Sequence, residues 1–219
     1  MIIALIGDVH ANLPALEAVM DHARKEGAVE FWNTGDFVGY GAFPDEVVQI
    51  LKKEATRSII GNYDQKVLRV TKKIDEWKKT KPKEKWMAFS WAYENLAKEN
   101  LGYLRSLPQE LRFSMHGNRI LIVHGSPLSA KEHLGPDTPV ARLRALSKAA
   151  KADVIICGHS HLPFVLELDG VHFVNPGSVG RPDDGDPRAS YATLKIKSRG
   201  IKVTHHRVAY NVERAVEAI

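Results

Sequence analysis

The first half of the chain alternates short apolar runs with segments whose apolar residues recur at helical spacing. The apolar run at residues 2–6 is too short for a helix and ends at Gly7, which is typical of a strand. Pro14 can occupy the first turn of a helix, and apolar residues then recur on one helix face up to Gly27. Continued in this way, the pattern predicts strands at 2–6, 29–32 and 57–60 and helices at 14–27, 45–54 and 62–68.

A longer amphipathic segment follows a lysine-rich stretch. Its apolar residues fall on a single helix face and are Trp86, Phe89, Ala92, Tyr93 and Leu96. Because these positions follow the i, i+3, i+6, i+7, i+10 pattern of one helix face, they predict one continuous helix over residues 86–98.

The second half of the chain is richer in strand patterns. Apolar runs predict strands at 120–123, 154–157, 164–168, 171–174, 191–196 and 202–207, with a helix at 139–150. Asp169 and Gly170 separate two of these runs, and Asp-Gly between β-type segments is typical of a hairpin. Strands and helices alternate in the first half of the chain, and consecutive strands follow in the second half. This order indicates one domain of two packed sheets flanked by helices.

Composition places the chain among ordinary globular proteins. Its 219 residues are 44% hydrophobic and 26% charged, which excludes wholesale disorder and suits one domain spanning residues 1–219. Cys157 is the only cysteine, so an intrachain disulfide is excluded and a reducing compartment is indicated. No apolar run approaches the roughly 18 residues of a membrane span, and Asp8 and His10 interrupt the apolar start too early for a signal peptide. We therefore expect a cytoplasmic protein with no membrane partner.

The net charge of +5 is concentrated in one segment. Residues 66–85 contain nine basic and three acidic side chains, so this window carries +6 and the remainder of the chain −1. We expect a basic helical insertion at about 66–99. Clustered lysines with Trp77 and Trp86 could bind nucleic acid, but a solvated insertion explains them more simply, and a lid over a cleft is a third interpretation.

Polar residues with catalytic or metal-binding chemistry follow the apolar strands at five places. The five clusters are Gly7-Asp8-Val9-His10, Gly35-Asp36, Gly61-Asn62-Tyr63-Asp64, His124-Gly125 and Gly158-His159-Ser160-His161. Ligands of open α/β sheets bind beyond the carboxyl ends of the strands, so we expect these side chains to converge. The adjacent glycines allow tight turns and close approach of the backbone.

The residue types in these clusters are those of a metal site. The candidate ligands are Asp8, His10, Asp36, Asn62, His124, His159 and His161. A set of carboxylates, imidazoles and one amide, without a thiolate, favours divalent Mn, Fe, Co, Ni or Zn, and manganese is the ion we expect first. Seven groups are too many for one ion, whereas two ions that share Asp36 would use all of them. Two such ions leave the site electropositive and suited to a phosphate anion.

The ordered motifs GDVHAN, GDFVGYG, GNYD, HG, GHSH and NPGSVG resemble those of the calcineurin-like metallophosphoesterases. More narrowly, they are similar to the small prokaryotic phosphodiesterases and the diadenosine-tetraphosphatase-like members of that superfamily. The resemblance covers the chain from Gly7 to about Tyr191. It implies a four-layer α/β/β/α sandwich of two mixed sheets and an in-line attack by a metal-bound hydroxide on a phosphate ester.

The resemblance also assigns roles to the candidate residues. It implies that one ion is held by Asp8, His10, Asp36 and His161. It implies that the other ion is held by Asp36, Asn62, His124 and His159. Asp36 would then bridge the two ions. The catalytic set carried over in this way is Asp36, Asn62, Tyr63 and Asp64.

Tyr63 stands where the superfamily usually has a histidine that stabilises or protonates the leaving oxygen. A tyrosine hydroxyl has an ordinary pKa near 10 and is a poor proton donor at neutral pH. We therefore expect phosphodiesters or nucleotide-type phosphoanhydrides to be hydrolysed in preference to phosphomonoesters. The alternatives are a phosphomonoesterase or protein phosphatase, a nuclease, and a non-catalytic metal-binding scaffold. The sequence carries no indication of oligomeric state.

Simpler interpretations exist for several of these residues. Asn62 could cap the following helix, and Asp64 could be an acid of its first turn rather than a support for the ligands. Tyr63 could serve packing alone. The loop at 175–178 could be only a turn, although the resemblance places it near the site. Arg181 could contact a phosphate, but a solvated arginine is the simpler expectation.

Overall fold

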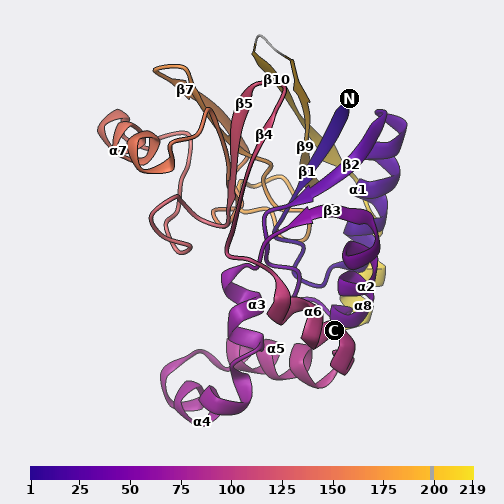
Figure 1. The fold of residues 1–219 in the computed structure, drawn as a ribbon. Coiled ribbons are helices and arrows are strands. Elements are labelled where there is room, and N and C mark those ends of the chain that lie inside the picture. Colours follow the sequence, from indigo (N-terminus) through magenta and orange to yellow (C-terminus); the bar gives the residue numbers. More distant parts are fainter. Residues whose placement is uncertain (198–199) are drawn as a thin grey trace.

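The computed structural model of the protein describes residues 1–197 and 200–219. Its strands form two five-stranded sheets that face each other, and helices cover both outer sides (Figure 1). The strands are β1 (Ile2–Ile6), β2 (Ala28–Asn33), β3 (Ala55–Ser58), β4 (Glu110–Met115), β5 (Asn118–Val123), β6 (Val154–Ile156), β7 (Phe164–Leu168), β8 (Val171–Asn175), β9 (Ala189–Ile196) and β10 (Ile201–Val208). The helices are α1 (Leu13–Lys25), α2 (Pro44–Glu54), α3 (Asn62–Val67), α4 (Val70–Thr80), α5 (Lys83–Glu94), α6 (Lys98–Ser106), α7 (Val140–Ala150) and α8 (Val212–Glu217).

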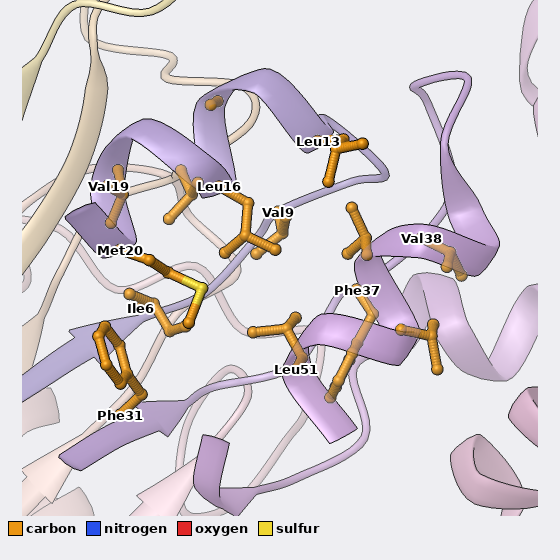
Figure 2. Close-up of a cluster of buried hydrophobic side chains, with 14 of the residues drawn as sticks. Ile6, Val9, Leu13, Leu16, Val19, Met20, Phe31, Phe37, Val38 and Leu51 are labelled. Carbon is orange, nitrogen blue, oxygen red and sulfur yellow. The ribbon is translucent and has the colours of Figure 1, made fainter. Parts of the chain in front are cut away.

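The first sheet has the strand order β10-β9-β1-β2-β3. β1, β2 and β3 run parallel, whereas β9 runs antiparallel to β1. Parallel neighbours need a crossover connection, and α1 and α2 provide it on the outer face of this sheet (Figure 1). Figure 2 shows Met20 of α1 beside Ile6 of β1 and Phe31 of β2 within the apolar layer under these helices. The alternating pattern of the first half therefore builds one mixed sheet with its cover.

The second sheet has the strand order β4-β5-β6-β8-β7, and α7 covers its outer face (Figure 1). β5, β6 and β8 are parallel, and β4 and β7 close the sheet as antiparallel edges. The turn between β7 and β8 is formed by Asp169 and Gly170, which have φ of 51° and 78°. Positive φ at both positions is the geometry that Asp-Gly favours in two-residue hairpins, so the predicted hairpin is confirmed.

The innermost core lies between the two sheets. It is formed by apolar side chains of both inner faces, among them Ile3, Leu5, Trp32, Ile120, Ile122, Val154, Ile156 and Val174. Trp32 of β2 contacts Phe113 of β4 edge-on, with ring centroids 5.1 Å apart. Together with the two helix layers, these sheets form the four-layer α/β/β/α sandwich that the sequence predicted. In the part of the chain that the structure describes, no helix has the length and apolar character needed to cross a membrane.

Two predicted elements differ from the observed ones. The expected helix at 86–98 is wrong as a continuous element, because α5 ends at Glu94 and α6 begins at Lys98. Asp45 of α2 causes the break: its carboxylate accepts hydrogen bonds from the backbone of Ala97 and the side chain of Asn100, both at 2.7 Å. These bonds give hydrogen-bond partners to polar groups at the start of α6.

The second difference concerns strands. β3 pairs with β2 over residues 55–58 rather than 57–60, because the Ile60 N–H leaves the ladder and donates to the carbonyl of Pro108 at 2.9 Å. β4 was not predicted, although Leu111, Phe113 and Met115 alternate with exposed residues along it. The lysine-rich residues 66–85 lie at the end of α3, in α4 and at the start of α5.

Candidate metal centre

The candidate ligands converge where strands of both sheets end. Asp8 and His10 follow β1, Asp36 follows β2, and His124 follows β5. His159 and His161 follow β6, while Asn62 begins α3 beyond β3. The sheets face each other, so the loops at these strand ends meet at one edge of the sandwich. The expected convergence is therefore present, and it gathers the side chains into two groups.

The first group consists of Asp8, His10 and His161, and we call it the Asp8 group. One ligand atom from each residue lies within 4.8 Å of the others. His161 Nε2 is 3.5 Å from Asp8 Oδ1 and 3.1 Å from His10 Nε2. All three residues are buried, and no donor in the described part of the chain forms a hydrogen bond with Asp8 Oδ1. A buried carboxylate oxygen without a donor, facing two imidazole nitrogens, suits a cation.

The second group consists of Asp36, His124 and His159, and we call it the Asp36 group. His124 Nε2 lies 3.4 Å from Asp36 Oδ2, and His10 Nε2 of the Asp8 group lies 3.9 Å from the same oxygen. The other oxygen, Oδ1, accepts the backbone N–H of Tyr63 at 2.7 Å. Asp36 is thus oriented by one oxygen and presents the other to histidines of both groups.

Asn62 lies between the Asp36 group and Lys66. One end of its amide is 2.9 Å from His124 Nε2 and 3.0 Å from Asp36 Oδ2, and the other end is 3.1 Å from Lys66 Nζ. With nitrogen facing Asp36, the amide donates to that carboxylate and accepts from the lysine. The reverse orientation points the amide oxygen at the Asp36 group. Asn62 is not the cap of α3, since it is the first helical residue and Gly61 precedes it as the N-cap.

Asp64 supports the loop that carries Asp36. Its carboxylate accepts hydrogen bonds from the backbone N–H groups of Asp36 at 3.0 Å, Phe37 at 2.9 Å and Val38 at 3.2 Å. It also accepts the N–H of Gly61 at 2.9 Å, which satisfies the start of α3. Asp64 is fully buried and belongs to neither ligand group. Both interpretations of Asp64 therefore apply, because it caps the helix and holds the neighbouring loop.

The histidines of the two groups differ in basicity. Burial lowers the pKa of His10 to about 4, with the nearby imidazole of His161 adding to the effect. Burial also lowers the pKa of His159 to about 4, so both rings are neutral at physiological pH. For His124, burial acts in the same direction but is outweighed by the charge and hydrogen bond of Asp36, which raise its pKa to about 9. Neutral imidazole is the form that ligates metal ions, and His124 would have to lose a proton to do so.

The backbone that carries these ligands is unusual. Asp8, His10, Asp36, His159 and His161 all have φ between 50° and 67°, in the left-handed region. Residues other than glycine rarely occupy this region, and such strain is concentrated at functional sites. The Asp36 loop also packs closely on Gly61, where an added Cβ would lie 2.1 Å from Asp36 Oδ1.

Tyr63 lies at the edge of the Asp8 group, as the sequence predicted. Its ring contacts that of His10 edge-on at 5.1 Å between centroids, and its hydroxyl is hydrogen-bonded to the hydroxyl of Tyr40. The ring of Phe89 of α5 also contacts the Tyr63 ring, with the centroids 5.1 Å apart. Burial, reinforced by the hydrogen bond with Tyr40, raises the pKa of Tyr63 above its ordinary value. The hydroxyl therefore stays protonated at neutral pH and is a weaker acid than a free tyrosine.

The loop at 175–178 supports candidate ligands that follow strands of both sheets. Asn175 donates hydrogen bonds to the carbonyl of Gly158 at 2.9 Å and to Ser160 Oγ at 3.1 Å, on either side of His159. Ser178 Oγ donates to the carbonyl of Asp8 at 2.7 Å. The interpretation of this segment as a turn alone is therefore incomplete.

Of two cationic residues near the site, Lys66 differs from its sequence-based interpretation and Arg181 agrees with it. Lys66 was predicted only as one member of the basic segment, but its Nζ reaches Asn62; the signal that could have identified it is its place four residues after Asn62. Arg181 was expected to be solvated, and its side chain is exposed. Its guanidinium lies over the ring of Tyr40 at 4.9 Å and pairs with Asp183 at 3.0 Å.

Comparison with known proteins matches this architecture to a single family. The model of the calcineurin-like phosphoesterase superfamily domain matches residues 1–199. An uncharacterised protein of Methanocaldococcus jannaschii is 33% identical, over 99% of this chain and 91% of its own length. The phosphodiesterase YfcE of Escherichia coli is 28% identical, over 85% of this chain and 83% of its own. The crystal structure of a metallophosphoesterase from Sphaerobacter thermophilus superposes with a TM-score of 0.81 at 32% identity, covering 100% of this chain and 92% of that one.

Proposed function

Because this chain belongs to the calcineurin-like phosphoesterase superfamily, we propose that it hydrolyses phosphodiester or nucleotide-type phosphoanhydride bonds with two divalent metal ions. One observation carries the proposal. Asp36 Oδ2 lies 3.4 Å from His124 of its own group and 3.9 Å from His10 of the Asp8 group. A carboxylate oxygen between two sets of imidazoles has the placement needed to bridge two ions.

The residues present fit such a centre. Asp8, His10 and His161 would hold one ion, His124, His159 and Asn62 would hold the other, and Asp36 would contact both. The donor set contains oxygen and imidazole nitrogen, which suits manganese first and also iron, cobalt, nickel or zinc. Bound ions would supply an activated water nucleophile and would neutralise the negative charge that develops on the phosphoryl oxygens.

The chain's own residues prepare the site for this chemistry. Tyr63 fixes one oxygen of Asp36 through its backbone N–H, so the other oxygen keeps a defined direction. Asp64 holds three consecutive backbone N–H groups of the Asp36 loop. Such support reduces the reorganisation needed when ions and substrate bind.

The preference for diesters and anhydrides rests on Tyr63. Its hydroxyl is engaged with Tyr40 and has a raised pKa, so it is poorly suited to protonate an alkoxide. Aryl and phosphate leaving groups depart as stable anions and need little protonation. The similarity to the phosphodiesterase of Escherichia coli also supports a preference for diesters.

The test combines metal content with a substrate panel. Purified protein reconstituted with Mn²⁺ is expected to hold close to two ions per chain, measured by mass spectrometry after desalting. Activity is compared on an aryl phosphodiester, an aryl monoester, a dinucleoside polyphosphate and single-stranded DNA. We expect Asp36→Asn to lose metal and activity, whereas Asp75→Asn on the exposed face of α4 should keep both. Full activity of Asp36→Asn would contradict the bridging role, and preferred hydrolysis of the monoester or the DNA would favour a phosphatase or a nuclease.

A further inference from the structure

Lys66 is a cation of α3 that lies beside the candidate metal centre. It lies one helical turn after Asn62, and its Nζ is 3.1 Å from the outer end of the Asn62 amide. The ammonium also lies over the ring of Tyr63, 4.1 Å from the centroid, and 5.7 Å from that of Phe89. Two aromatic faces and one amide thus hold a half-buried charge in a defined place.

This charge lacks an ionic partner. Among residues 1–197 and 200–219, Lys66 forms no ion pair within 4.0 Å, whereas Arg181, which lies over the ring of Tyr40, is matched by Asp183 at 3.0 Å. Lys81, Lys85 and Lys131 add positive charge around Lys66, and Asp36 is the acid whose charge reaches it. A half-buried ammonium in cationic surroundings favours an anionic ligand.

The orientation of Asn62 controls whether Lys66 is free. When the amide nitrogen faces Asp36, the amide oxygen accepts a hydrogen bond from Lys66. In the orientation that could ligate an ion, the oxygen faces His124 at 2.9 Å and the NH₂ group is turned toward the ammonium. Two donors then face each other, so Lys66 loses its acceptor and its hydrogen-bonding capacity becomes available to a substrate.

We propose that Lys66 binds a second, non-reacting phosphate of the substrate and thereby selects phosphoanhydrides over simple diesters. This inference rests on the proposed function, because the reacting phosphate is assigned to the metal centre. Lys66 adjoins the Asp36 group through Asn62, so a phosphate held by Lys66 can be joined directly to one held at that group. A simple aryl diester has a single phosphate and places an uncharged ring there.

The experiment compares Lys66→Met, which keeps the length of the side chain, with Lys66→Arg, which keeps the charge. Lys72→Met is the matched control, because Lys72 is an exposed lysine of the same basic segment in α4. Each Mn²⁺-loaded protein is assayed for kcat/KM on diadenosine tetraphosphate and on bis(p-nitrophenyl) phosphate. Binding of inorganic pyrophosphate to the same proteins is measured by calorimetry, and thermal melting reports folding.

We expect Lys66→Met to lose about tenfold to hundredfold in kcat/KM on diadenosine tetraphosphate, the range of one charge-assisted hydrogen bond. On bis(p-nitrophenyl) phosphate, the loss of kcat/KM in the same variant should stay below about threefold. Its Kd for pyrophosphate should rise about tenfold or more. Lys66→Arg should retain most of the wild-type kcat/KM on diadenosine tetraphosphate and most of the affinity for pyrophosphate. Lys72→Met should match the wild type in both measurements.

The proposal is overturned if Lys66→Met lowers kcat/KM equally on both substrates. That result would mean that Lys66 acts on the metal centre and not on a second phosphate. It is also overturned if pyrophosphate binding is unchanged. Should the wild type hydrolyse neither substrate, the proposed function fails, while pyrophosphate binding still decides the role of Lys66. If Lys66→Met melts early, Lys66→Gln takes its place in every measurement.

Discussion

Asp64 and Asp36 hold each other's loops. The Asp64 carboxylate accepts the backbone N–H of Asp36 at 3.0 Å, and the Asp36 carboxylate accepts the N–H of Tyr63, the neighbour of Asp64, at 2.7 Å. The ligand at the end of β2 and the start of α3 are thereby fixed together, although they are 28 residues apart in the chain. The position of the Asp36 carboxylate therefore depends on a second acid that belongs to neither ligand group.

Replacement of Asp64 by alanine is expected to destabilise the protein strongly. Four buried backbone N–H groups would lose their acceptor, and each unsatisfied group costs about 1–3 kcal/mol. We expect Asp64→Ala to lower the free energy of unfolding by about 3 kcal/mol or more, and Asp64→Asn, which keeps one acceptor oxygen, to lose less. Urea denaturation of the metal-free proteins measures the free energy of unfolding of each variant. An unchanged midpoint for Asp64→Ala would show that the N–H groups find other acceptors.

A methyl group at Gly61 should disturb the centre. An alanine Cβ would lie 2.1 Å from Asp36 Oδ1 and 2.2 Å from its backbone nitrogen, so the loop must move. We expect Gly61→Ala to lower Mn²⁺ affinity at least about tenfold, the effect typical of disturbing the groups that orient a ligand. Gly102→Ala is the control, since nothing lies within 4 Å of its Cβ and alanine favours the α6 helix. Titration calorimetry measures the Mn²⁺ affinity of both variants. Equal affinities of Gly61→Ala and Gly102→Ala would contradict the expected loss at Gly61.

Metal binding should release a proton from His124. The pKa of this imidazole is raised from 6.5 to about 9, because the effect of Asp36 exceeds that of burial. A raised pKa means that the His124–Asp36 pair stabilises the metal-free protein fully below pH 6.5 and loses this contribution as the pH rises through 9. Metal affinity should rise over the same interval, because an ion needs the neutral ring.

Calorimetry in two buffers of different ionisation enthalpy counts these protons. The number released on Mn²⁺ binding should be smaller by about one at pH 9.5 than at pH 7.5. His133→Asn is a suitable control, because the ring of His133 contacts His159 at 4.3 Å but belongs to neither ligand group. A proton count that does not change with pH would mean that His124 is already neutral at pH 7.5.

Asn175 should couple the stability of the second sheet to the histidine loop. It is fully buried and donates to Gly158 and Ser160, while its side-chain oxygen accepts the N–H of Gly177 at 2.9 Å. We expect Asn175→Ala to lose about 2–4 kcal/mol of unfolding free energy and to weaken metal binding, because the groups around His159 lose their partner. Asn95→Ala, at an exposed helix end, should change neither quantity by more than about 1 kcal/mol. Chemical denaturation with and without Mn²⁺ separates the two effects.

The family and the four layers could be predicted from the sequence, and both are confirmed. The candidate ligands lie within five residues of the end of an apolar strand, and this local pattern predicted that they would converge. The end of α5 could not be predicted in this way, because it depends on Asp45, which reaches Ala97 from α2. Lys66 was hidden for a different reason: in sequence it is one of many lysines. The predicted helix at 62–68 places it one turn after Asn62 but does not show that its Nζ reaches the Asn62 amide.

The left-handed backbone at five of the candidate ligand positions restricts which ions the proposed centre could be re-engineered to prefer. Aspartate, asparagine and histidine tolerate a positive φ better than most residues, whereas other side chains pay roughly 1–2 kcal/mol per position. A single substitution at Asp8 or His159 that introduces a thiolate for a softer ion would therefore also strain the loop. Exchange among oxygen and imidazole donors is open to point mutation, but a sulfur-rich centre would require the turns themselves to be rebuilt.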